Sequence, residues 1–126
     1  MTYYIDLANA LVNKHSRHVS FLLYRNKIAS IGINNPLKTH PRNLNYKFRG
    51  RNDEDISHFV GIHSELSAVI RLGEEDLSKY TLINVRINRE NEVSLSKPCG
   101  GCQDMIKQLG IKKVLYTDEK GEFVEM

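Results

Sequence analysis

Two periods in the spacing of hydrophobic and polar residues predict the secondary structure of this chain. Apolar side chains recur at helical spacing over 3–13, over a short segment between Gly61 and Gly73, and over 98–109. Two segments rich in apolar and aromatic residues, 18–25 and 27–33, flank a polar turn at Asn26, which is typical of an antiparallel hairpin. Further strands are expected over 81–88, 112–117 and 122–124, the last two joined by a turn.

These elements follow one another as helix, strand, strand, loop, helix, strand, helix, strand, strand. Helices interleaved with strands favour an α/β fold in which a mixed sheet is covered on both faces. No repeat, low-complexity tract or linker divides residues 1–126, so a single domain is expected. The pattern does not determine the strand order. The irregular segment from Asn34 to Val60 is long for a simple connection, and loops of this length are usually functional.

Composition places the chain among soluble globular proteins. Of its 126 residues, 40% are hydrophobic and 26% are charged, a balance unlike that of disordered chains. No apolar run approaches the roughly 18 residues of a membrane span, so no membrane partner is expected. The first residues lack a basic leader followed by an apolar run, which argues against a secretory signal. A cytoplasmic location, in the host if the protein is viral, is therefore expected.

A basic stretch lies within the long loop. It holds five cations and no acidic residue, with Tyr46 and Phe48 between them: Lys38, Arg42, Lys47, Arg49 and Arg51. Such a stretch could clamp the phosphate of a nucleotide. It could also follow a single-stranded nucleic acid whose bases stack on the two rings. Alternatively, it is a solvated loop that the two rings attach to the core. The sequence leaves the three interpretations open.

The chain has two cysteines, Cys99 and Cys102, in a C-x-x-C spacing. In a reducing compartment this spacing favours a metal site or redox chemistry over a disulfide. A catalytic zinc ion takes three protein ligands and keeps one position open for water, and His63 with the two cysteines supplies that number. Pro98 suits the first turn of the predicted helix, and the positive end of the helix dipole favours the thiolate form that a metal needs.

Glu65 stands two residues after His63, a spacing that does not share one face inside a helix. Both side chains reach one pocket only if they lie at the start of the helix. A carboxylate beside zinc-bound water could move protons as a general acid and base. The competing interpretations are a thioredoxin-like redox pair and a purely structural zinc site, for which His58 or His40 could supply a fourth ligand.

His63-Ser64-Glu65 followed by Pro98-Cys99-Gly100-Gly101-Cys102 matches the H-x-E and P-C-x-x-C signature of zinc deaminases. The run from Pro98 to Gln103 is similar to that of free cytidine deaminases and blasticidin deaminases. The segments 63–68 and 96–126 also resemble small deaminase-like proteins of phages and viruses. The chain therefore resembles the cytidine/deoxycytidylate deaminase superfamily, and the match in element order covers nearly its whole length.

This resemblance implies a fold and a site. The fold is a three-layer α/β arrangement with a mixed five-stranded sheet, helices on both faces and a C-terminal antiparallel hairpin. His63, Cys99 and Cys102 would hold Zn²⁺, and Glu65 would be the catalytic proton shuttle. Asn34 in Gly32-Ile33-Asn34 is similar to an asparagine that binds sugar in relatives, although Pro36 stands where free cytidine deaminases have a glutamate. Expected substrate contacts are Asn34, Ser64, Pro98, Arg49 and Arg51.

The function expected from these residues is the zinc-dependent hydrolysis of cytosine to uracil in a pyrimidine nucleoside or nucleotide, a reaction of nucleotide metabolism. Two alternatives remain. One is a cytosine deaminase that acts on single-stranded DNA or RNA. The other is a catalytically silent, zinc-stabilised module that binds nucleic acid, against which the intact Glu65 argues. The superfamily also suggests a homo-oligomer.

Overall fold

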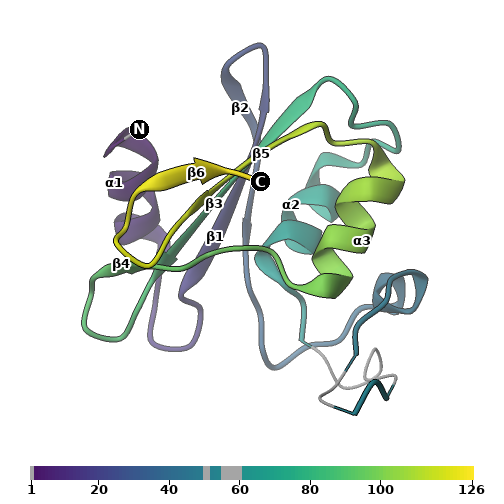
Figure 1. The fold of residues 1–126 in the computed structure, drawn as a ribbon, viewed down its shortest axis with the longest axis horizontal. Helices are drawn as coiled ribbons and strands as arrows, with labels where there is room; N and C mark the ends of the chain where they lie inside the picture. Colours follow the sequence, from purple (N-terminus) through teal and green to yellow (C-terminus); the bar gives the residue numbers. More distant parts are fainter. Residues whose placement is uncertain (1, 50–51, 55–60) are drawn as a thin grey trace.

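Three layers form the fold in the computed structural model, which describes residues 2–49, 52–54 and 61–126. A central sheet carries helix α1 (Thr2–Leu11) on one face, while α2 (Ser64–Leu72) and α3 (Gly100–Leu109) lie side by side on the other (Figure 1). The predicted α/β class and the helices on both faces are confirmed. In the described part of the chain, no helix is long and apolar enough to cross a membrane.

The sheet is mixed and contains six strands, one more than predicted. Its strands are β1 (His18–Tyr24), β2 (Lys27–Ile33), β3 (Tyr80–Ile87), β4 (Val93–Ser94), β5 (Lys113–Thr117) and β6 (Phe123–Glu125). Their order is β2-β1-β3-β5-β6, and the short β4 pairs with the C-terminal end of β3. Only β3 and β5 run parallel among these pairs. The predicted C-terminal antiparallel hairpin is β5–β6.

The β1–β2 hairpin closes through a two-residue turn. Tyr24 pairs with Lys27 across the strands, and the two residues between them, Arg25 and Asn26, have positive φ angles of 52° and 64°. Positive φ at both positions gives the turn a twist that matches the twist of the strands. Asparagine tolerates this conformation better than most residues, which is why Asn26 marks the turn in the sequence.

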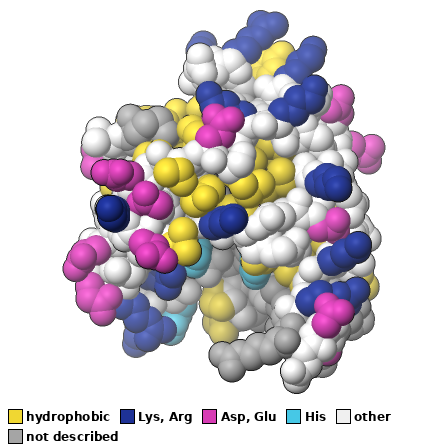
Figure 2. Space-filling view, viewed as in Figure 1, with side chains coloured by type: hydrophobic (Ala, Val, Ile, Leu, Met, Phe, Trp, Pro, Cys, Tyr) yellow, Lys and Arg dark blue, Asp and Glu magenta, His cyan; other side chains and the backbone are white. Residues whose placement is uncertain are grey.

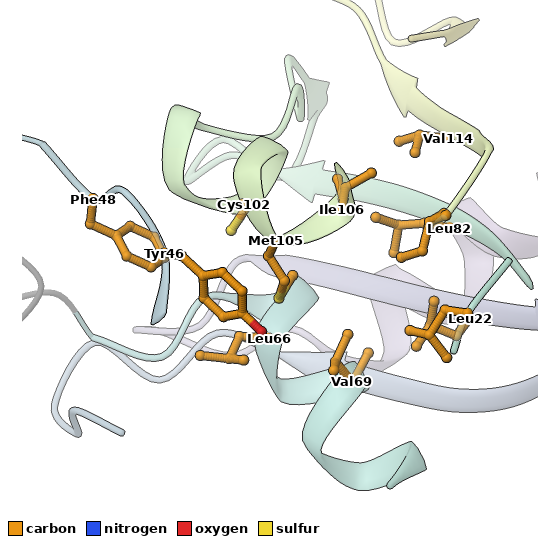
Figure 3. Close-up of a cluster of buried hydrophobic side chains, with 13 residues drawn as sticks. Leu22, Tyr46, Phe48, Leu66, Val69, Leu82, Cys102, Met105, Ile106 and Val114 are labelled. Atoms are coloured by element: carbon orange, nitrogen blue, oxygen red, sulfur yellow. The ribbon is translucent and has the colours of Figure 1, made fainter. Parts of the chain in front are cut away.

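Alternate side chains of the central strands build two separate cores. Val19, Phe21 and Leu23 of β1 pack toward α1, whereas Leu22 faces α2 and α3. The core beneath α2 and α3 includes Leu66, Val69, Met105 and Ile106 (Figure 3). Because consecutive strand residues point to opposite faces, every second residue of β1 and β3 lies beneath the two helices.

Part of the long loop also belongs to the core. The rings of Tyr46 and Phe48 are buried, and Figure 3 shows Tyr46 beside Leu66 and Met105, with Phe48 next to Tyr46. A 3-10 helix, Pro41–Asn45, precedes them, although the sequence pattern predicted only irregular structure there. The Nδ1 atom of His40 accepts a hydrogen bond from the Arg42 amide at its start. The structure thus supports the interpretation in which the two rings attach the loop to the core.

Candidate metal centre

The residues before α2 and α3 place two of the predicted ligands. His63 is the N-cap of α2 and Cys99 the N-cap of α3, and neither side chain makes a capping hydrogen bond. Both side chains are therefore available at adjoining helix ends, with Cys102 in the first turn of α3. The prediction that Pro98 occupies this turn is wrong, because the helix begins after Cys99. Pro98 instead lies outside it, where its carbonyl accepts a hydrogen bond from Gln103 Nε2 at 2.8 Å.

The three predicted ligands converge on one point. Their ligand atoms lie within 4.8 Å of one another. The Nδ1 atom of His63 is 3.4 Å from Cys99 Sγ and 3.3 Å from Cys102 Sγ. Tetrahedral zinc, with ordinary Zn–N and Zn–S bond lengths, holds a nitrogen and a sulfur about 3.5 Å apart. The donor set and its spacing therefore fit zinc. No fourth His, Cys, Asp or Glu joins this cluster among the described residues; His58 lies outside them.

The electrostatics of the three ligands also suit a cation. The pKa of the Cys99 thiol is lowered to about 4, first by a hydrogen bond from Cys102 and then by His63. The same hydrogen bond, together with burial, raises the pKa of Cys102. Burial alone would lower the pKa of His63, but the Cys99 thiolate raises it above its ordinary value. One thiolate is thus formed readily, and metal binding must displace the protons on the other groups.

Glu65 lies at the start of α2, as predicted from its spacing to His63. Its side chain is 6% exposed and lines a cavity of about 290 Å³ together with His63 and Cys99. Both carboxylate oxygens accept hydrogen bonds. Asn84 Nδ2 donates to Oε2 at 2.9 Å, and Ser64 Oγ donates to Oε1 at 3.1 Å. These bonds fix the carboxylate at the cavity wall, beside the ligands but outside their cluster.

Two residues that the sequence analysis did not single out complete this arrangement. Ser20 and Asn84 are direct partners on β1 and β3, and both are buried on the face beneath α2. Ser20 Oγ donates to Asn84 Oδ1 at 2.6 Å and lies 2.7 Å from Ser64 Oγ. Glu65, Ser64, Ser20 and Asn84 therefore form a closed ring of side chains. The sequence offered one indication of these two residues, because each is a polar residue within an otherwise apolar strand. Buried polar residues are more informative about a site than exposed apolar ones.

The sequence comparison now identifies the family. Residues 1–118 match the family described as the cytidine and deoxycytidylate deaminase zinc-binding region. The chain belongs to this family. No curated protein matches it significantly.

Solved structures show that the fold of this deaminase-family chain is shared. The apo dCMP deaminase of cyanophage S-TIM5 is 21% identical with a TM-score of 0.56, over 93% of this chain and 79% of that chain. The same enzyme in complex with dCMP and dUMP is 20% identical with a TM-score of 0.57, over 94% and 80%. At this level of identity the likeness establishes the common architecture. Zinc is the cofactor of the family, and His63, Cys99 and Cys102 are positioned to bind it.

The predicted substrate contacts of this deaminase-family chain are only partly brought together. Asn34 lines the Glu65 cavity, and its side-chain oxygen accepts a hydrogen bond from the His18 amide at 3.0 Å. Ser64 lines the cavity too, but its hydroxyl is engaged in the ring with Ser20 and Glu65. Pro98 is buried and is not among the described residues that line the cavity.

The described cations nearest the ligands in the basic stretch, Lys47 and Arg49, line a different hollow from the Glu65 cavity. Arg49 is exposed and lines a neighbouring hollow with His63 and Cys99, while Arg51 lies outside the described residues. The Phe48 ring meets the His63 imidazole edge to face, with 5.2 Å between the ring centroids. It also fills the space where a side chain on Gly101 would sit. Phe48 therefore supports a predicted ligand. The interpretation in which bases stack on Tyr46 and Phe48 is not supported, because both rings are buried.

Proposed function

We propose that this chain catalyses the hydrolysis of cytosine to uracil, with release of ammonia, in a pyrimidine nucleoside or nucleotide. The observation that carries the proposal is the cavity in which the buried carboxylate of Glu65 adjoins His63 and Cys99. When bound by the three ligands, zinc supplies an activated water for attack on an electron-poor carbon. Glu65 would accept a proton from the attacking water and would return protons to the ring nitrogen and to the departing amino group.

The other cavity residues suit a base that carries a sugar. The Nδ2 amide of Asn34 makes no hydrogen bond within the described part of the chain and is the group that would reach the sugar. The similar cyanophage dCMP deaminase has been solved with dCMP and dUMP, which supports a nucleotide. The burial of Tyr46 and Phe48 speaks against a single-stranded nucleic acid, because those rings would have stacked its bases.

Ammonia release tests the proposal. The zinc-loaded protein is incubated with cytidine, deoxycytidine, CMP, dCMP and a cytosine-containing oligonucleotide, and Glu65→Gln serves as the matched inactive control. Release from at least one small substrate, absent in the variant, is the expected result. Release from the oligonucleotide alone would replace the proposal with a polynucleotide deaminase. No release from any substrate would favour a zinc-stabilised binding module.

A further inference from the structure

A hollow separate from the one beside Arg49 adjoins the Glu65 cavity at the C-terminal end of β3. It measures about 220 Å³, and its wall includes Arg86, Arg89, Arg17 and His15. It shares two wall residues, His18 and Asn34, with the Glu65 cavity, so the two spaces lie next to each other. Figure 2 shows Lys, Arg and His side chains side by side at the lower left of the molecule, the end where the 88–92 turn lies.

The charge of this hollow is positive. Among the residues that the structure describes, no Asp or Glu lines it, although Glu90 and Glu92 are exposed on the adjacent turn. Arg86 and Arg89 are exposed and make no hydrogen bond or ion pair within residues 2–49, 52–54 and 61–126. Exposed guanidinium groups that lack a partner in the fold are suited to bind an anion.

Arg17 and His18 have other roles in the same wall. Arg17 Nε donates to the Ile87 carbonyl at 3.0 Å and Nη2 to the Asn88 carbonyl at 2.7 Å, so its guanidinium fixes the end of β3. The pKa of His18 is lowered to about 4, first by burial and then by the charge of Arg86. His18 is therefore neutral at neutral pH, and Arg86 and Arg89 are the unengaged charges of the hollow.

The shape of a pyrimidine nucleotide leads from the reacting atom to this hollow. The C4 amino group lies across the ring from N1, which carries the sugar and phosphate. With C4 beside Glu65 and the metal ligands, the sugar must leave along the part of the wall that those residues do not form. His18 and Asn34 lie in that part. Of the described residues, the hollow beside Arg49 shares only His63 and Cys99 with the cavity, so these two predicted ligands lie between Arg49 and the base.

We propose that Arg86 and Arg89 bind the phosphate of the substrate, which makes a nucleoside monophosphate the preferred substrate. The inference rests on the proposed function and narrows its substrate class. Guanidinium groups pair with phosphate through paired, charge-assisted hydrogen bonds. A phosphate bound there would anchor the nucleotide at the end opposite its reacting carbon.

Binding and turnover together test this assignment. The double variant Arg86→Gln, Arg89→Gln is compared with wild type, with Lys97→Gln and with Lys27→Gln. Lys97 is an exposed cation of the Glu65 cavity, and Lys27 is an exposed cation at the opposite end of the β1–β2 hairpin. Affinities for dUMP and deoxyuridine are measured by calorimetry on the zinc-loaded proteins, and kcat/KM is measured for dCMP and deoxycytidine.

Loss of charge-assisted bonds to a phosphate should weaken dUMP binding and dCMP turnover about tenfold or more in the double variant. Deoxyuridine and deoxycytidine lack the phosphate and should change by less than about twofold, and Lys27→Gln should match wild type. An unchanged preference for dCMP in the double variant would overturn the assignment. So would a preference lost only in Lys97→Gln, or a wild type that treats dCMP and deoxycytidine alike. If no substrate releases ammonia, the proposed function fails, and the difference between dUMP and deoxyuridine binding still decides the phosphate site.

Discussion

Glu65 combines burial with two hydrogen-bond donors aimed at its carboxylate, one from α2 itself and one from β3. A carboxylate placed at the edge of a cavity in this way loses little orientational freedom when a substrate enters. Preorganisation of this kind is a property of proton-transfer groups rather than of residues that merely fill space. At the residue scale, the proposed chemistry therefore depends on the groups that hold Glu65 as well as on Glu65.

Replacing Glu65 by glutamine should separate metal binding from catalysis. The variant keeps the side-chain shape, and Glu65 lies outside the ligand cluster, so about one zinc per chain should remain. Turnover should fall by at least about a hundredfold, the lower end of general acid–base contributions. Metal analysis and kcat on the same preparation measure both effects. Wild-type turnover would exclude the proton-transfer role, and lost zinc would exclude the present ligand set.

Replacing Asn84 by alanine should impair catalysis without touching any ligand. The change removes the donor to Glu65 Oε2 and the acceptor of Ser20 Oγ. A drop of about tenfold in kcat with KM nearly unchanged is expected, because a bond of this strength orients the carboxylate only. Ser30→Ala is the matched control, since it removes another buried hydroxyl from the same sheet face, bonded to the Ala68 carbonyl. Equal kcat losses in both variants would indicate a merely structural effect.

The ligands were predictable because their chemistry is rare in a sequence, whereas their supports were not. Two thiols and an imidazole at these spacings have few other uses, and the structure brings them together. Ser20 and Asn84 are common residue types whose role depends on which strand they face. Their meeting requires β1 and β3 to be neighbours in one register, and a single residue of slip would turn both to the other face.

At the element scale, the absence of a side chain at Gly32 allows the backbones of α2 and β2 to approach each other closely. A Cβ added to Gly32 would overlap the Ser64 carbonyl oxygen and the Ala68 backbone, so the helix lies directly on the strand. The first turn of α2, with His63 at its cap and Glu65 inside it, takes its position from this contact. Backbone atoms cannot move aside as the end of a flexible side chain can.

Gly32→Ala should therefore destabilise the fold and displace the site together. A loss of about 1–3 kcal/mol in the free energy of unfolding is expected from overpacking, with weaker zinc binding. Urea unfolding and zinc titration measure the two effects. Gly100→Ala is the control for stability, because a Cβ on Gly100 meets nothing within 4 Å. Similar stability of Gly32→Ala and wild type would show that α2 can shift without cost.

Most elements were predicted from periodicity, within a residue or two of their ends. The exceptions are too short to show a period. β4 has two residues and exists because β3 extends beyond its pairing with β5, which leaves an edge that Val93 and Ser94 occupy. The 3-10 helix at Pro41–Asn45 has five residues and is closed by local bonds. The start of α3 was misplaced because a cysteine cap has no propensity signal of its own.

For the whole molecule, the sequence predicted the layers but not the order of strands within the sheet. Alternation assigns faces, whereas order depends on contacts between residues far apart in the chain. The position of β3 between β1 and β5 is such a case. This position places Ser20 of β1 next to Asn84 of β3, on the sheet face that α2 and α3 cover. The candidate site therefore exists only once the sheet has formed.

The lowered pKa of His18 should make the free energy of unfolding depend on pH. Because its pKa is lowered from 6.5 to about 4, the unfolded chain takes up a proton before the folded chain does. The stability that neutral His18 contributes is full above pH 6.5 and is lost as the pH falls toward 4. Between pH 7.5 and 5, wild type should lose about 1–2 kcal/mol more than His18→Gln, in urea unfolding of zinc-free proteins. His15→Gln, which removes an exposed imidazole, is the control. Equal losses in wild type and His18→Gln would contradict this account.

The two helix caps have a consequence for local opening. The first bonds inside α2 and α3 run from the Ser67 amide to the His63 carbonyl, at 3.0 Å, and from the Gln103 amide to the Cys99 carbonyl, at 2.8 Å. The acceptor residues are the metal ligands, so release of the metal should loosen both first turns in one event. Hydrogen exchange at the Ser67 and Gln103 amides should then accelerate together when zinc is chelated, or in Cys99→Ser, while the Phe21 amide within β1 keeps its rate. Exchange that accelerates at one helix alone would mean that the two caps open independently.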